Sequence, residues 1–328
     1  MTTNIKRPHQ GKTQKTINPI YVLIGFLVFG VVCLIIGAFL DWNISSALAG
    51  DDASRWAQSF GNVFSFIPGT LCAILIMFVG SLLILGQPHK FKLRWTKIIY
   101  LIIAYLLVSA AVTFCVYDGC VRELEYSFNL HSNSAEQTKW LHTWAVLYAA
   151  IGAIVGMVVS SLLVQYLIRG GTNKAICFKW ALYVFIIIAI QWLIIFLLKT
   201  NISRERYESI IIDQGGDLGM FKPWYSLIWN QSAGSGFPYA SFPSGHTNWA
   251  STLIPIIIIT ILMFNRKLPL QIISIIFVAT IIVVTMFARI QSGYHYLSDT
   301  AMTVFIASIC NIAVYLGVYK LNLIKLPK

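Results

Sequence analysis

The chain has 328 residues, of which 57% are hydrophobic and only 11% are charged, and its mean hydropathy is +0.73. These values exclude an ordinary soluble domain and indicate an integral membrane protein. The net charge of +12 does not indicate a nucleic-acid partner, because the basic residues are distributed along the chain as membrane orientation requires.

Apolar runs long enough to cross a bilayer, which takes about 17–25 residues of helix, recur along the chain. We therefore predict an all-α, polytopic membrane helix bundle that forms a single membrane domain over residues 1–328. Residues 1–16 are expected to be a basic tail, and residues 17–168 the N-terminal helices. The eight predicted transmembrane spans are Ile17–Leu40, Val63–Leu85, Ile98–Tyr117, Leu141–Ile168, Trp180–Leu198, Thr247–Phe264, Leu270–Ala288 and Ser298–Leu321.

The charged residues segregate across these spans. If the N-terminus is cytoplasmic, sixteen of the 24 basic residues fall in inner segments and all twelve acidic residues fall on the outer side. Lys and Arg accumulate in short cytoplasmic loops, and a miscounted helix would scramble this pattern. We therefore expect both termini to be cytoplasmic. The run from Ile17 is too long for a signal-peptide core, so we expect it to be retained as the first helix.

The stretch SFPSGHTNWAS, at Ser241–Ser251, lies at the outer end of the sixth predicted span. A helix N-terminus presents backbone N–H groups and a partial positive charge, which suit an anion such as phosphate. Ser244 adds a hydroxyl donor, Gly245 lets a bound group approach the backbone, and His246 can supply a proton. Taken alone, the stretch fits a capped helix start with a chance histidine equally well.

A second polar cluster precedes the eighth span on the same side. In ARIQSGYHYLSD, Arg289 is followed by His295 six positions later and by Asp299 four positions beyond that. If Asp299 opens the eighth helix, its carboxylate is within hydrogen-bond reach of the His295 imidazole. It can then orient the ring and stabilise its cationic form.

A third cluster follows the fifth span, in KTNISRERYES. Lys199, Arg204 and Arg206 are three of only eight outer basic residues, and they fall within eight positions. An exposed ion pair with a nearby Glu explains Arg204 equally well, so we leave it out of the expected site. Cations, backbone donors and two histidines in one pocket would make a site for phosphoryl transfer through a covalent phosphohistidine.

Together the three segments resemble the signature of the type 2 phosphatidic acid phosphatase (PAP2) superfamily, which includes glucose-6-phosphatase and the vanadium haloperoxidases. That signature reads Lys-x6-Arg-Pro, then Pro-Ser-Gly-His, then Ser-Arg-x5-His-x3-Asp. The matching residues here are Lys199-x6-Arg206, Pro243-Ser244-Gly245-His246 and Arg289-x5-His295-x3-Asp299. The resemblance covers residues 180–321, the expected PAP2-like catalytic core.

The chain departs from the family in two motif positions and in helix number. Tyr207 stands where the family has Pro, and Ala288 where it has Ser. Neither lost residue carries a fixed charge, so the expected catalytic set survives. The family core has six helices, and the surplus pair is expected among the first four spans.

By this resemblance, His295 is the nucleophile on phosphorus and Asp299 orients it. His246 protonates the leaving oxygen and then activates water. No metal and no cofactor is implied, because the acidic residues lack paired ligand spacing. The groups expected to bind the phosphate oxygens are Lys199, Arg206, Ser244, the Gly245 amide and Arg289.

The loop GMFKPWYSLIWNQ bears on the substrate. Its apolar residues at i, i+3, i+4 and i+7 would line one face of a short helix lying in the outer leaflet, or of a lid packed on the bundle; both interpretations stay open. These residues are Phe221, Trp224, Tyr225 and Ile228.

We therefore predict a multi-pass phosphatase of the cell membrane that hydrolyses a lipid phosphate or diphosphate on the extracytoplasmic side, with lipids as its expected partners. Candidate substrates are undecaprenyl diphosphate, phosphatidic acid, phosphatidylglycerol phosphate and lipid A. Two alternatives remain open. The protein could be a phosphotransferase that uses a lipid diphosphate, or it could bind or transport a phospholipid without cleaving it.

Overall fold

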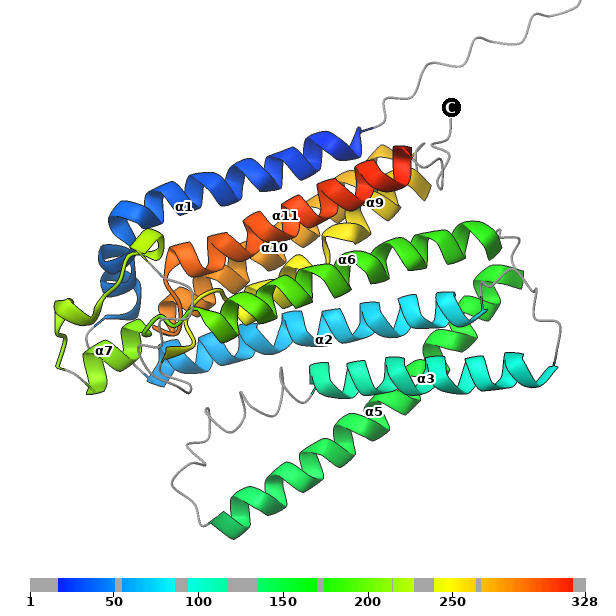
Figure 1. Ribbon diagram of the computed structural model, residues 1–328, viewed down its shortest axis with the longest axis horizontal. Coiled ribbons are helices and arrows are strands. Elements are labelled where there is room, and N and C mark those ends of the chain that lie inside the picture. The colour runs from blue at the N-terminus through cyan, green and yellow to red at the C-terminus, as the bar shows by residue number, and fades with distance from the viewer. Residues whose placement is uncertain are drawn as a thin grey trace, which may run out of the picture.

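The computed structural model describes residues 17–50, 55–85, 94–116, 135–169, 174–213, 215–226, 239–263 and 267–320. Its named elements are all helical, as the composition predicted. The long helices are α1 (Pro19–Ala49), α2 (Arg55–Leu85), α3 (Arg94–Val116), α5 (Ala135–Arg169), α6 (Lys174–Asn201), α10 (Leu268–Gln291) and α11 (Leu297–Lys320) (Figure 1). The short elements are α7 (Tyr207–Asp213), η3 (Leu218–Met220), η4 (Trp224–Ser226), α8 (Gly245–Ser251) and α9 (Ile254–Met263).

Within the described residues, six segments are long and apolar enough to cross a membrane, which indicates a multi-pass membrane protein. They agree with six of the eight predicted spans. Helices α3 and α5 occupy the other two predicted runs, and their membrane crossing stays a prediction, as does the side on which the termini lie. The predicted basic tail, residues 1–16, lies outside the described residues.

The sixth predicted span is not one continuous helix. A turn at Thr252 and Leu253 separates α8 from α9, whereas we predicted a single helix over Thr247–Phe264. Pro255 explains the break, because proline lacks an N–H and its ring clashes with the carbonyl one turn earlier in a continuous helix. In the structure Pro255 falls in the first turn of α9, where proline is tolerated.

Helix α1 packs along α11 through two glycines (Figure 1). A Cβ added at Gly30 would lie 3.0 Å from the backbone nitrogen of Phe305, and one at Gly37 would lie 3.0 Å from that of Ser298. Small residues let membrane helices approach this closely, since lipid provides no hydrophobic force between helices. The contact brings Asp41, one turn after Gly37, to the start of α11.

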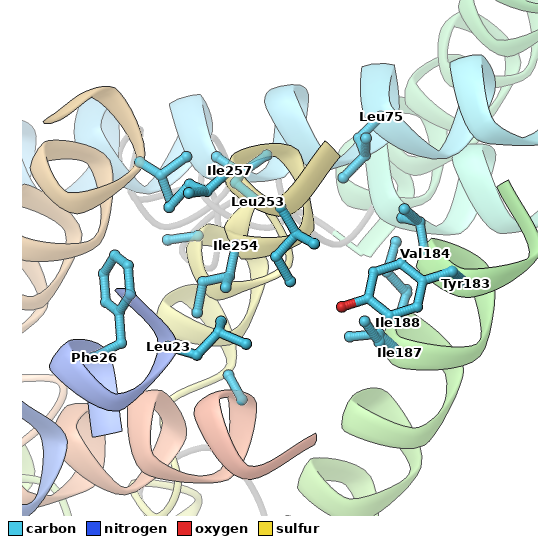
Figure 2. Packing of buried hydrophobic residues seen from close by; sticks show 14 of the residues in the cluster. Leu23, Phe26, Leu75, Tyr183, Val184, Ile187, Ile188, Leu253, Ile254 and Ile257 are labelled. Atoms are coloured by element: carbon cyan, nitrogen blue, oxygen red, sulfur yellow. The ribbon is translucent and has the colours of Figure 1, made fainter. Parts of the chain in front are cut away.

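Apolar side chains from α1, α2, α6 and α9 meet in the core, as Figure 2 shows for Leu23, Leu75, Ile187 and Ile254. Other apolar residues on the same helices point outward, among them Phe196, which is 62% exposed. Outward apolar faces are expected where helices contact lipid acyl chains.

Helices α3 and α5 lie beside α2, away from α1 and α11 (Figure 1). The three helices share a polar contact, in which the Ser161 hydroxyl lies 2.8 Å from the Tyr105 hydroxyl and 3.3 Å from that of Ser81. The six candidate spans lie in α1, α2, α6, the α8–α9 pair, α10 and α11. The surplus pair expected among the first four predicted spans stays a prediction.

Candidate active site

The loop before α8 is held by the two other motif segments. The Lys199 ammonium donates hydrogen bonds to the carbonyl oxygens of Ala240 at 2.7 Å and Pro243 at 3.2 Å. The backbone N–H of Ser244 donates to the carbonyl oxygen of Asp299 at 3.1 Å. The structure thus brings the three predicted segments together through the backbone of this loop.

His295 lies in the turn between α10 and α11 and is 1% exposed. Its Nδ1 is 2.6 Å from the carbonyl oxygen of Ser241. A carbonyl oxygen can only accept, so Nδ1 carries the proton and the neutral ring presents its lone pair at Nε2.

Asp299 does not bond the imidazole directly, contrary to our expectation. The shortest separation, between Nδ1 of His295 and Oδ2 of Asp299, is 3.8 Å. Oδ2 instead accepts from the Ser241 hydroxyl at 2.5 Å and from the Tyr296 backbone N–H at 2.9 Å. Asp299 therefore acts on the ring through its charge and through Ser241, whose carbonyl bonds Nδ1.

Positive charges surround this histidine. The guanidinium carbons of Arg206 and Arg289, both buried, lie 5.3 Å and 4.6 Å from the Tyr294 ring centroid. Burial holds the pKa of His295 well below its ordinary value. Asp299 opposes this shift, while Lys199 and the two arginines add to it. The imidazole is consequently neutral at neutral pH and has the lone pair that a nucleophile needs.

The start of α8 borders open space. The Ser244 hydroxyl oxygen caps α8 by accepting from the Thr247 N–H at 3.4 Å and from the Thr247 hydroxyl at 3.0 Å, which leaves its own proton for another acceptor. A Cβ added at Gly245 would meet no atom within 4 Å. His246 follows and is partly exposed, unlike the buried His295. Of the described residues, no group of three or more His, Cys, Asp or Glu is placed to hold a metal.

Arg204 is not an exposed residue paired with a Glu, as we had considered. It is 1% exposed and its guanidinium lies between two carboxylates. Nη1 is 2.5 Å from Oδ1 of Asp299, and Nη2 is 2.9 Å from Oδ2 of Asp41. Our sequence analysis missed Asp41 because the predicted first span ended one residue before it. The signal available was an acidic residue directly after an apolar run.

The Tyr that replaces the family Pro has a structural role. Tyr207 is the first residue of α7, a position that also suits proline. Its buried ring lies 5.0 Å from that of Trp42 and 6.5 Å from that of Tyr296, between centroids. The substitution therefore connects α7 to α1 through aromatic packing.

The predicted amphipathic helix over residues 221–228 does not form within its described part. Phe221 is irregular in backbone and packs inward against Trp42 and Tyr296. The Trp224 indole donates to the Leu34 carbonyl of α1 at 3.2 Å. Of the three predicted apolar residues that the structure describes, only Tyr225 is well exposed; the fourth, Ile228, lies outside the described residues. These contacts favour the lid over the leaflet helix, since proline at 223 and two inward rings leave no single apolar face.

Comparison with known proteins agrees with these motifs. Residues 180–323 match the model of the PAP2 superfamily, and this stretch contains all three motif segments but none of α1, α2, α3 and α5. No curated protein and no solved structure matches the chain. The superfamily indicates phosphatase activity on phosphate monoesters. Residues 180–323 thus form a PAP2 superfamily domain in a helical membrane protein.

Proposed function

We propose that the protein hydrolyses a lipid phosphate or diphosphate at the extracytoplasmic face of the cell membrane through a phosphohistidine on His295. One observation carries the proposal. The Nδ1–H of His295 is committed to the Ser241 carbonyl, which leaves the Nε2 lone pair for phosphorus. Lys199, Arg206 and Arg289 act electrostatically on the same ring and would neutralise phosphate oxygens.

In the first step, Nε2 of His295 attacks phosphorus as the bond from phosphorus to the leaving oxygen breaks. His246 donates its proton to that oxygen, so the lipid leaves as a neutral alcohol, or as a monophosphate when the substrate is a diphosphate. The ring becomes cationic while phosphorus is bonded to it. The Asp299 carboxylate, 3.8 Å from Nδ1, stabilises that charge.

In the second step, neutral His246 takes a proton from water, and the water oxygen attacks phosphorus. The phosphorus–nitrogen bond breaks, inorganic phosphate leaves, and the lone pair returns to Nε2 of His295. The Ser244 hydroxyl, the Gly245 amide and the three cations would bind the nonbridging oxygens in both steps.

A lipid substrate is supported by the position of the site at the ends of membrane-spanning helices. The η3 and η4 segment beside it exposes apolar side chains, with Leu218 61% and Tyr225 63% exposed. Such groups at a membrane surface suit an acyl or prenyl chain. Undecaprenyl diphosphate, phosphatidic acid, phosphatidylglycerol phosphate and lipid A are the candidates. The extracytoplasmic side follows from the charge segregation, and we take residues 180–321 as the catalytic core behind the N-terminal helices.

Phosphate release by the purified protein in detergent, measured with these four lipids, tests the proposal. We expect release from at least one of them, with none from a His295→Ala variant. Transfer of the phosphoryl group to an added alcohol in preference to water would indicate a phosphotransferase. Lipid binding with no product would indicate a binding or transport protein.

A further inference from the structure

Asp41 is a buried carboxylate in a membrane-spanning helix outside the PAP2 domain. It lies in α1 and is 2% exposed, whereas the family match begins at residue 180. A carboxylate in such a place is costly unless it is paired, and an ionisable residue within a membrane segment is by default a candidate functional residue.

One oxygen of Asp41 fixes the first turn of α11. Oδ1 accepts from the Ser298 backbone N–H at 2.9 Å, one of the first N–H groups of a helix, which have no partner inside it. Oδ2 accepts from the Ser298 hydroxyl. Asp41 therefore caps α11 from a neighbouring helix, immediately before Asp299.

The same carboxylate shares Arg204 with Asp299. The planar guanidinium uses Nη2 for Asp41 at 2.9 Å and Nη1 for Asp299 at 2.5 Å, while Nε donates to the Lys222 carbonyl at 2.9 Å. Its central carbon lies 4.1 Å from the Tyr296 ring centroid. A lysine has no planar fork and could not bridge both acids in this geometry.

These contacts continue to the nucleophile. Asp299 accepts from the Ser241 hydroxyl at 2.5 Å, and the Ser241 carbonyl lies 2.6 Å from Nδ1 of His295. With both carboxylates ionised, one guanidinium between them leaves a net negative charge near the ring. If Asp41 lost its charge, Arg204 would offset the charge of Asp299 alone.

We propose that Asp41 is a positioning residue of the active site: through Arg204 and the first turn of α11, it holds Asp299 where that carboxylate serves His295. This inference rests on the proposed phosphatase function. It makes α1 a necessary part of a site whose motifs all lie in the PAP2 domain. In the part of the chain that the structure describes, Asp41 bonds Arg204 and Ser298 and none of the groups proposed to bind phosphate, so it should affect turnover and leave phosphate affinity unchanged.

The test uses Asp41→Asn in the full chain, assayed on whichever of the four candidate lipids the wild type hydrolyses fastest. Asparagine keeps the shape and one acceptor oxygen, but its amide N–H groups would face Arg204 or Ser298. We expect kcat to fall about 10–100-fold, as for other small displacements of catalytic groups. KM and the inhibition constant of inorganic phosphate should stay within about twofold.

Two further variants separate positioning from general damage to the fold. Ser45→Ala is the matched control, because Ser45 is equally buried on the same face of α1, one turn after Asp41, and its hydroxyl has no hydrogen-bond partner among the described atoms. It should keep wild-type kcat. Arg204→Lys should lose at least as much turnover as Asp41→Asn, because Arg204 also contacts Asp299 directly. The double variant should lose less than the two single losses combined, since the two residues share a contact. If Asp41→Asn does not fold, Asp41→Glu carries the test, because it keeps the charge but displaces it by one methylene and should lower kcat with KM unchanged.

The outcomes distinguish the two proposals. Wild-type kcat in Asp41→Asn, with an inactive His295→Ala, would overturn the inference and leave the phosphatase function intact. Weakening of phosphate inhibition as large as the loss in kcat would also overturn it, by placing Asp41 in phosphate binding. Full activity in His295→Ala would overturn the proposed function, and this inference with it.

Discussion

The Nδ1 of His295 lies 2.6 Å from the carbonyl oxygen of Ser241, so a backbone group orients the imidazole that we propose as nucleophile, and the Asp299 carboxylate lies 3.8 Å from the same nitrogen. The side chain of Ser241 connects the two, because its hydroxyl donates to Asp299. Replacing Asp299 and removing the Ser241 hydroxyl should therefore lower kcat by different amounts.

Asp299→Asn should lower kcat on the order of 10²–10⁴-fold, because it removes the charge that stabilises the cationic ring and breaks the pair with Arg204. Ser241→Ala should cost less, about 10-fold, since the carbonyl that bonds His295 remains. Steady-state kinetics of the two variants checks this order. A larger loss in Ser241→Ala than in Asp299→Asn would contradict it.

Two glycine replacements should separate the site from the fold. Gly245→Ala meets no protein atom within 4 Å, so we expect wild-type thermal stability but loss of phosphate inhibition and of activity. Gly293→Ala is the contrast, because Gly293 has a φ of 72° and its Cβ would lie 3.2 Å from that of Glu208. The left-handed conformation alone should destabilise that variant by about 1–2 kcal/mol. Melting curves in detergent measure the stability of both variants. A destabilised Gly245→Ala variant would show that the space beside the start of α8 is filled.

The buried histidine should make stability depend on pH. The folded pKa of His295 is well below its unfolded value of about 6.5, so the unfolded chain binds the proton first as pH falls. Stability contributed by the neutral ring is complete above the unfolded pKa and is lost as pH falls below it. As pH falls below the unfolded pKa, the wild type should lose more stability than His295→Gln. Parallel melting curves for the two proteins would argue against a neutral, buried ring.

The proposed orientation predicts which surface residues face the outside. In a background without native cysteines, Tyr225→Cys should react with an impermeant thiol reagent in intact cells, and Lys267→Cys only after lysis. Both positions are exposed in the structure, so accessibility in the lysate serves as the internal control. Reaction of Lys267→Cys in intact cells would contradict the topology.

The sequence predicts residues that belong to motifs with fixed local spacing, but it does not predict contacts between segments that are far apart in the chain. The motif spacing singled out Lys199, Arg206 and His295, and in the structure both cations act electrostatically on that histidine, while their roles in catalysis stay a prediction. Asp41 escaped notice, because its partner Arg204 is 163 positions away and no periodicity connects them.

Two other features of the structure were not predicted, for different reasons. Pro255 was a sequence signal for the break between α8 and α9, but we gave hydropathy more weight than proline. The bond from His295 to Ser241 was not readable, since it uses a backbone carbonyl, which carries no residue-specific signal. Asp299 looked like the direct partner only because its spacing from His295 matches one helical turn, whereas α11 begins after His295.

The central claim is the phosphohistidine, and rapid-quench kinetics of the two histidine variants tests it most directly. With p-nitrophenyl phosphate, whose leaving group needs little protonation, His246→Ala should form the phosphoenzyme in a burst and then stall, because no base activates water. The trapped phosphate should be acid-labile and should map to the peptide containing His295, while His295→Ala should give neither burst nor label. A burst from His295→Ala, or label on the His246 peptide, would contradict the assignment.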